Sequence, residues 1–188
     1  MTAILLAAGF ARRFGSQKLL ARIADGRYVV EAAANNLLAA TGQVIAVTGA
    51  DAELKRVLEN CGCQVVVNSD AEEGMGTSIA AGVCAGRKAG GWLIALGDMP
   101  FIRAATVTRV LAAMEATDGI VIPTFEGARG HPVGFAPKFG MDLMALRGDE
   151  GARSVVAAHL DQIKLLPVDD QGVLADIDTT DDLGDHRS

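Results

Sequence analysis

The amino-acid sequence predicts a single-domain α/β protein built on a doubly wound, mostly parallel sheet. Three observations lead to this prediction: short apolar runs alternate with segments of helical length, the runs are apolar without interruption, and the chain has 188 residues, half of them apolar. Uninterrupted apolar runs are typical of strands covered on both faces, and strand–helix alternation is typical of parallel sheets. The length suits one domain, expected to span residues 1–188.

The apolar runs are the expected strands, and we expect both faces of each to be buried. The segments between them are rich in Ala and Leu, which favour helices. A strand, helix, strand order places successive strands parallel in one sheet. The expected strands are residues 3–8, 43–48, 64–67, 92–96 and 119–122, and the expected helices are residues 29–40, 52–60, 77–87 and 104–116.

The last third of the chain is less regular. Residues 133–135 and 164–166 are short apolar runs and are expected to be strands. Residues 152–160 are expected to form a helix. These elements extend the predicted sheet without indicating a second domain.

Composition excludes several classes of function. The net charge of −6 disfavours nucleic-acid binding, which usually needs a basic surface. No apolar stretch approaches the ~18 residues of a membrane span, and the N-terminus lacks the pattern of a signal peptide. The three cysteines are an odd number and are expected to be free thiols. We therefore expect a cytoplasmic protein that binds neither nucleic acid nor membranes.

The segment after the first expected strand has the composition of a phosphate-binding loop. Residues 6–18 read L-A-A-G-F-A-R-R-F-G-S-Q-K, with two glycines, three cations and no acidic residue. Gly9 and Gly15 let backbone N–H groups approach phosphate oxygens, while Arg13 and Lys18 supply charge. The alternative for the two cations is ordinary solvation at the surface. The loop predicts a nucleotide ligand.

This loop is neither of the two common glycine-rich phosphate loops. A Walker loop has four residues between its glycines, followed at once by Lys and Ser or Thr. Here five residues separate Gly9 from Gly15, and Lys18 comes three positions later. A dinucleotide fingerprint would need G-x-G-x-x-G, which does not follow this strand.

Asp98 follows the expected strand at residues 92–96 and is the most informative acidic residue. A carboxylate at the end of an apolar strand is costly unless it is paired or binds a metal. Mg²⁺ binds one or two carboxylates together with substrate phosphates and water. The alternative is a helix cap, because a proline and a helix follow. In parallel sheets, ligands bind beyond the carboxyl ends of the strands, so Asp98 and the phosphate loop are expected to meet.

The motifs of the chain resemble those of the nucleotidyltransferases that include the molybdenum-cofactor cytidylyl- and guanylyltransferases. The loop is similar to L-A-A-G-x-(S/G)-x-R-x-G-x-x-K, with Ala11 where relatives commonly have Ser or Gly. Five further strings occur in the family's order, namely G-M-G-T-S-I at 74–79, L-G-D-M-P at 96–100, R-G-H-P-V at 129–133, G-D-E-G-A-R at 148–153 and D-I-D-T at 176–179.

The resemblance implies a Rossmann-like fold and the transfer of a nucleoside monophosphate from an NTP·Mg²⁺ complex to a phosphorylated acceptor. It implies catalytic roles for Arg13, Lys18 and Asp98, with CTP as donor and molybdopterin carrying molybdenum as acceptor. A molybdoenzyme or its chaperone is the protein partner that it implies. The nucleotide-binding residues implied are Leu6, Ala7, Ala8, Gly9, Gly15, Asn68, Gly76, Thr77 and Ser78.

Alternatives stay open for several of these residues. Gly76, Thr77 and Ser78 could read a base edge or cap a helix, and Asn68 could contact the nucleoside or form a turn.

The acceptor and the second metal ligand are assigned to the second half of the chain. His131, between Gly130 and Pro132, is expected to contact the acceptor. Arg153 binds a substrate phosphate or forms an ordinary ion pair. Asp176 and Asp178 project to one side of an extended segment, and Asp178 is the expected metal ligand or, alternatively, precedes a helix.

Two other functions fit the sequence. Within the same chemistry, the donor could be GTP, or the acceptor a sugar or polyol phosphate. In another class, the chain could be a non-catalytic nucleotide- or cofactor-binding module that delivers a cofactor to a partner enzyme. Retention of Lys18, Asp98 and Asp178 favours the enzyme.

Overall fold

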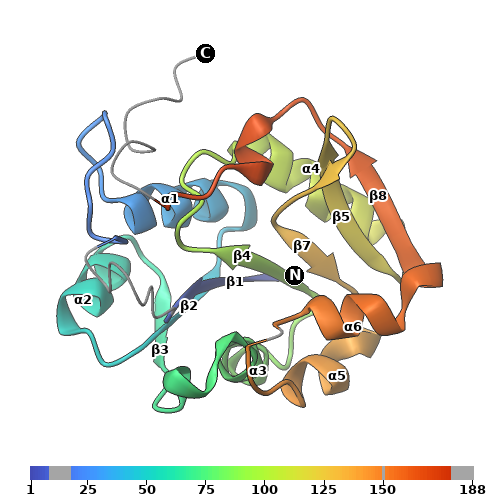
Figure 1. Ribbon diagram of the computed structural model, residues 1–188, viewed down its shortest axis with the longest axis horizontal. Helices are drawn as coiled ribbons and strands as arrows, with labels where there is room; N and C mark the ends of the chain where they lie inside the picture. Colours follow the sequence, from blue (N-terminus) through green and yellow to red (C-terminus); the bar gives the residue numbers. More distant parts are fainter. Residues whose placement is uncertain (9–17, 150, 179–188) are drawn as a thin grey trace.

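The computed structural model describes residues 1–8, 18–149 and 151–178. Its strands form one sheet, which runs through the centre of the molecule (Figure 1). Within the described residues the strands are β1 (Thr2–Ala7), β2 (Val44–Thr48), β3 (Gln64–Val67), β4 (Trp92–Leu96), β5 (Ile120–Phe125), β6 (Ala128–Arg129), β7 (Val133–Phe135) and β8 (Ile163–Pro167).

The strand order is β3-β2-β1-β4-β7-β5-β6, with β8 paired to β5. β1 pairs in parallel with β2 and β4, β2 with β3, and β5 with β8. β7 is antiparallel to both of its neighbours, β4 and β5. The sheet is therefore mixed but mostly parallel, as predicted.

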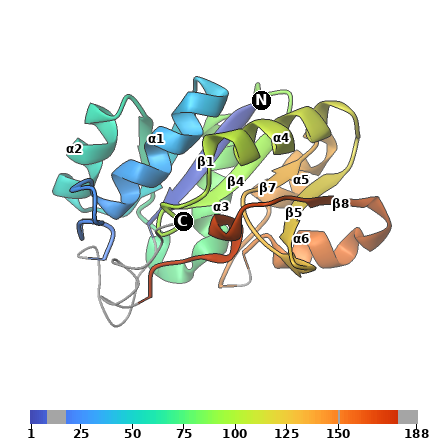
Figure 2. The same ribbon diagram turned by 90° about the horizontal axis from the view of Figure 1, so that it is seen from above.

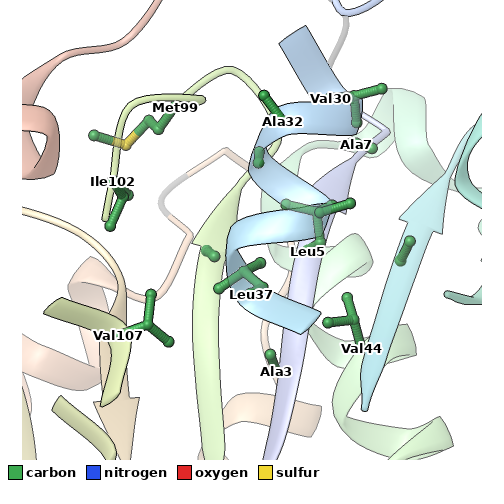
Figure 3. Close-up of a cluster of buried hydrophobic side chains, with 14 of the residues drawn as sticks. Ala3, Leu5, Ala7, Val30, Ala32, Leu37, Val44, Met99, Ile102 and Val107 are labelled. Carbon is green, nitrogen blue, oxygen red and sulfur yellow. The ribbon is translucent and has the colours of Figure 1, made fainter. Parts of the chain in front are cut away.

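Helices connect the strands and cover both faces of the sheet. The sheet is the central layer, and helix α1 packs across its strand β1 (Figure 3). The α-helices are α1 (Val29–Thr41), α2 (Ala52–Asn60), α3 (Met75–Ala85), α4 (Ala104–Glu115), α5 (Gly140–Met144) and α6 (Arg153–Ala158), and the 3-10 helices are η2 (Ala71–Glu73), η3 (Pro137–Phe139), η4 (Leu160–Gln162) and η5 (Gln171–Leu174).

Two hydrophobic cores lie on opposite faces of the sheet. Successive strand residues point to opposite faces, so Leu5 packs in one core with α1, α2 and α4, and Ile4 packs in the other with α3, α5 and α6. Figure 2 shows these helices on the two sides of the sheet. The doubly wound α/β architecture predicted from the sequence is thus confirmed.

The predicted elements occur with small shifts in their ends. α3 begins at Met75 rather than at the predicted residue 77, and β5 runs on to Phe125. The sequence analysis did not predict β6 and α5, which are only two and five residues long. Elements this short carry too little periodicity to be recognised.

The prediction that every strand is buried on both faces was wrong for β3. Gln64 is exposed and 51% of Val67 is exposed. β3 is the edge strand next to β2, so it lacks a neighbour on one side. The apolar composition of a strand does not reveal its position in the sheet.

The antiparallel direction of β7 decides where His131, the residue expected to contact the acceptor, lies. Trp92 pairs with Phe135 and Ile94 pairs with Val133. Continuing this register places His131, two residues before Val133, beside the carboxyl end of β4. The reversed strand therefore brings a residue from the second half of the chain to the strand ends where Asp98 lies.

Asp170 fastens the segment after β8 to the start of α4. Its side chain is only 2% exposed and accepts hydrogen bonds from Arg103 N (2.9 Å), Gly172 N (3.1 Å) and the Thr106 hydroxyl. The adjacent η5 supports the site, because Val173 O accepts a hydrogen bond from His131 N (2.9 Å). A buried carboxylate with three donors is a structural lock between two elements.

No helix in the described part of the chain is long and apolar enough to cross a membrane.

We predict that Asp170→Ala lowers the free energy of unfolding by about 3 kcal/mol, because three buried donors lose their acceptor. Urea denaturation measures the change. Asp169→Asn, next to it but exposed, is the matched control and should stay within about 0.5 kcal/mol of the wild type. Equal midpoints for the two variants would show that the lock does not stabilise the fold.

Candidate nucleotide and metal site

The site is built where β1 and β4 end side by side. Leu6 pairs with Leu96, and Gly97 N donates a hydrogen bond to Leu6 O (2.9 Å). A Cβ on Gly97 would lie 2.9 Å from that oxygen, so the close approach of the two strand ends requires glycine. Leu6, Ala7 and Ala8 are buried at this edge. Asp98 is the residue after Gly97.

Lys18 joins the two predicted metal ligands. Its Nζ lies 3.1 Å from Asp98 Oδ2 and 3.0 Å from Asp178 Oδ1. The exposed fractions of the three side chains are 11% for Lys18, 28% for Asp98 and 73% for Asp178. Lys18 therefore meets Asp98, 80 positions away, as the strand-end argument predicted, and Asp178, 160 positions away, joins them.

Asp98 does not act as a helix cap. The N-cap position of α4 is Arg103, five residues later. The carboxylate of Asp98 instead accepts a hydrogen bond from Lys18. The alternative prediction, that Asp98 caps the following helix, was therefore wrong.

The D-I-D segment is fixed to Asp98 by its backbone. Ile177 N donates to Asp98 O (2.9 Å), and the Ile177 side chain is 2% exposed within the core beside α1 and α4. Asp176 and Asp178 are exposed on either side of it. The extended segment alternates as predicted, with Ile177 inward and both carboxylates outward. The expected helix start after Asp178 falls outside the described residues.

The charges of this cluster act on one another. Burial alone would lower the pKa of Lys18, but the hydrogen bonds and charges of Asp178 and Asp98 outweigh it and raise the pKa above its ordinary value. Lys18 is therefore a permanent cation at neutral pH. The pKa of Asp176 is raised, first by burial and then by the charges of Asp178 and Asp98, against the influence of Lys18.

His131 lies close to this cluster, and Arg153 lies close to His131. Burial lowers the pKa of His131, against a hydrogen bond with the backbone of Ile94 and the charges of Asp98 and Asp176, while the charge of Arg153 lowers it further. The ring is therefore neutral at pH 7. Arg153 is exposed at the start of α6.

Three predicted nucleotide-binding residues form a closed hydrogen-bond network. Asn68 Nδ2 donates to Thr77 Oγ1 (2.9 Å) and Ser78 Oγ (3.0 Å), while Asn68 Oδ1 accepts from Asp70 N (3.0 Å). Thr77 Oγ1 lies 2.9 Å from the carbonyl oxygens of Asp70 and Gly74. These side chains are buried and hold the loop between β3 and α3 in one conformation.

Gly76, predicted to face a base, packs against the loop that follows α5. Gly76 N donates to Gly148 O (2.8 Å), and a Cβ on Gly76 would lie 2.8 Å from the backbone of Arg147. A Cβ on Gly74 would lie 2.3 Å from the backbone of Gly148. The Gly76 N–H is therefore already bonded, and G-M-G-T-S contacts G-D-E-G-A-R directly.

The loop itself lies outside the described residues, and with it Arg13, Gly9 and Gly15. The structure thus brings together Leu6, Ala7, Ala8, Lys18, Asp98 and Asp178 at one edge of the sheet. His131 and Arg153 lie at the same edge through β7 and α6. Asn68, Thr77 and Ser78 lie in the loop that follows β3.

The sequence analysis missed Gly97 and Gly148 as site residues. Both occur in quoted motifs, L-G-D-M-P and G-D-E-G-A-R, so the signal was a glycine next to an acidic residue. A glycine required for close backbone contact cannot be distinguished by sequence from one in an ordinary turn.

The donor set suits a divalent ion that also binds phosphate. Among the described residues, no group of three or more His, Cys, Asp or Glu side chains lies close enough to hold a metal. Asp98 and Asp178 already hold one cation, the Lys18 ammonium, between two carboxylate oxygens. Two carboxylates completed by phosphates and water fit Mg²⁺ or Mn²⁺.

A doubly wound sheet with a cation and carboxylates at the ends of its central strands defines an α/β protein of the nucleotide-handling type. The particular family follows from comparison with known proteins. The chain belongs to the family of MobA-like NTP transferase domains, whose model matches residues 3–163.

One curated relative and one protein of known structure are similar over nearly the whole chain. Nicotine blue oxidoreductase of Paenarthrobacter nicotinovorans is 30% identical, over 97% of this chain and 94% of the relative. The crystal structure of Rv0371c from Mycobacterium tuberculosis H37Rv has a TM-score of 0.80 at 28% identity, covering 97% and 95% of the two chains. Its complex with manganese has a TM-score of 0.77 at 29% identity, covering 96% and 94%.

We predict that Asp176→Asn stabilises the protein free of metal and nucleotide. Burial raises the pKa of Asp176 in the folded state above the ordinary value of an aspartate. The folded protein therefore binds more protons at this group than the unfolded chain does, and stability falls as pH rises through that range. At neutral pH the ionised carboxylate is destabilising. Because the group is exposed, the gain should stay below about 1 kcal/mol, a rise in Tm of about 3 °C at most.

Thermal unfolding with EDTA at neutral pH measures this effect, and the gain should shrink as pH falls toward the ordinary carboxyl value. Asp118→Asn is the control, because the exposed Asp118 is paired with Lys138 at 3.3 Å. That variant should leave Tm unchanged or slightly lower it. A Tm of Asp176→Asn at or below the wild type would contradict the prediction.

Proposed function

We propose that this nucleotidyltransferase transfers a nucleoside monophosphate from an NTP to a phosphorylated acceptor. A phosphate oxygen of the acceptor attacks the α-phosphorus, a new P–O bond forms, the bond to the β-phosphate oxygen breaks, and pyrophosphate leaves. The observation that supports this most directly is the bridge from Lys18 to Asp98 and Asp178 at 3.1 and 3.0 Å. It joins a phosphate-binding cation to two metal-binding carboxylates.

The acceptor already carries its nucleophile, so the enzyme's task is positioning and charge stabilisation. Lys18, together with Arg13, holds the triphosphate and neutralises the negative charge of the leaving pyrophosphate. Asp98 and Asp178 hold the divalent ion, for which Mg²⁺ is proposed. Held by these two residues, the ion would supply positive charge that stabilises the charge developing on the phosphates. The manganese complex of Rv0371c supports a divalent ion in this family.

For the nucleotide, we propose that Leu6, Ala7, Ala8, Gly9 and Gly15 line the phosphates and the nucleoside with their backbones. Asn68, Thr77 and Ser78 support the base side of the pocket by fixing the loop between β3 and α3. Gly76 contributes by docking on Gly148. CTP is the proposed nucleotide donor, because G-H-P with G-D-E-G-A-R resembles the cytidylyl branch of the family.

For the acceptor, we propose that Arg153 binds its phosphate and that the neutral His131 positions it. Both lie at the edge of the sheet that carries Asp98, as their mutual influence on the pKa of His131 indicates. Molybdopterin carrying molybdenum is the proposed acceptor. A molybdoenzyme or its chaperone would then receive the product.

The direct test measures pyrophosphate release with Mg²⁺, each of the four NTPs, and molybdopterin or other phosphorylated acceptors. We expect release with CTP and little with GTP. Asp98→Asn should lower kcat by about 10²-fold or more, because the metal loses a charged ligand. Asp118→Asn should keep full activity.

No release with any donor and acceptor pair would overturn the proposal. A delivery module would instead bind nucleotide equally well with Asp98→Asn and release nothing in either form. The Paenarthrobacter relative is named an oxidoreductase, so the protein should also be assayed for oxidoreductase activity. Oxidoreductase activity without pyrophosphate release would replace the transferase proposal with an oxidoreductase function.

A second prediction separates the acceptor side of the site from its nucleotide side. Arg153→Gln should raise the KM for the acceptor by about 10-fold or more, because a charged hydrogen bond to phosphate is lost. The KM for the NTP should stay within about 2-fold. Steady-state kinetics with each substrate varied in turn measures both constants. A rise in the NTP constant alone would assign Arg153 to the nucleotide.

A further inference from the structure

We propose that Lys18 keeps the metal site closed in the free protein. Its ammonium occupies the place of the divalent ion between Asp98 and Asp178, so that the ion is taken up together with the nucleoside triphosphate and not before it. This inference rests on the proposed function, and it adds an order of binding to it.

The geometry of the bridge supports exclusion. The ammonium lies at nearly equal distances, 3.1 and 3.0 Å, from one oxygen of each carboxylate. A Mg²⁺ ion held by the same two oxygens would lie about 2.1 Å from each of them. The ion and the ammonium cannot occupy that point together, because they would be in contact and both are positive.

Lys18 is held firmly in this place. Its side chain is only 11% exposed, so little water is available to replace the carboxylates. Asp98 and Asp178 each contact its ammonium, at 3.1 and 3.0 Å. A metal ion alone must therefore displace a charged and largely buried competitor.

A triphosphate removes this obstacle because it offers Lys18 another partner. The lysine ammonium is a compact charge on a flexible stem and has three donors. When the triphosphate enters, the ammonium of Lys18 moves to phosphate oxygens. Asp98 and Asp178 are then released toward the ion that the phosphates carry.

The surrounding charges favour the same order. Asp176 adds a third acidic side chain two positions before Asp178, on the same extended segment. Among the described residues of this cluster, the carboxylates outnumber the single ammonium of Lys18. A triphosphate without its metal is repelled here, whereas the metal complex brings the positive charge that the carboxylates lack.

The experiment measures Mn²⁺ binding to the protein without nucleotide, by electron paramagnetic resonance of the free ion. The wild type should bind Mn²⁺ weakly, and Lys18→Gln should bind it at least about 10-fold more tightly, within the usual range of coupling between two ligands. Lys18→Arg retains the charge and should bind weakly like the wild type. Lys138→Gln removes a surface lysine paired with Asp118 and should change nothing.

The effect must run through the two carboxylates. Adding Asp98→Asn to Lys18→Gln should abolish the gain in Mn²⁺ affinity. Adding CTP or GTP should strengthen Mn²⁺ binding by the wild type much more than by Lys18→Gln. Far-ultraviolet circular dichroism and thermal unfolding establish that each variant is folded.

Equal Mn²⁺ affinity of the wild type and Lys18→Gln would overturn the inference. So would tight binding by the wild type alone, a measurement that needs no variant. These outcomes do not depend on turnover. If no pyrophosphate is released, the proposed function is refuted, but the Mn²⁺ comparison can still be made. If the two Mn²⁺ affinities are equal, the proposed transferase activity is unaffected and Lys18 is only a phosphate ligand.

Discussion

The bridge from Lys18 to Asp98 and Asp178 depends on three segments meeting at one edge of the sheet. Gly97 lets β4 end directly against β1, with its N–H on Leu6 O. The bond from Ile177 N to Asp98 O then fixes the C-terminal segment to the same turn. Since Ile177 is also buried in the core, the position of Asp178 is set by packing that extends to α1 and α4.

The side of this edge that is proposed for the acceptor comes from a reversed strand, β7. In a purely parallel sheet, the segment before a strand lies at the opposite edge from the carboxyl ends. β7 runs the other way, so the residue before it, Pro132, and then His131 lie beside the end of β4. Asp170 and η5 hold this arrangement from outside, through the bond from His131 N to Val173 O. The reversed direction of β7 therefore brings His131 to the edge that is proposed for the acceptor.

The sequence was sufficient for the architecture and for the meeting of Lys18 with Asp98, because strand ends in a doubly wound sheet must converge, whereas that argument did not place Asp178 beside them. It was insufficient for β3, whose edge position depends on strand order. It was also insufficient for Asn68, Thr77 and Ser78. These polar residues would look the same in sequence whether they faced a ligand or one another, and only the folded loop reveals that Asn68 uses its amide on its two neighbours. The roles given to Arg13, Gly9 and Gly15 stay predictions.

Among the described residues of the cluster, the acidic side chains outnumber the single ammonium of Lys18. The pKa of Asp176 is raised first by burial and then by the charges of Asp178 and Asp98. A sequence selected only for stability would replace one of these acids, since removing a repelling charge stabilises the folded state. Perturbed carboxylates retained at the end of a buried strand are instead characteristic of sites that bind cations or perform chemistry. Under the proposed function, the same repulsion among carboxylates that weakens the free protein would favour entry of a metal-bound triphosphate.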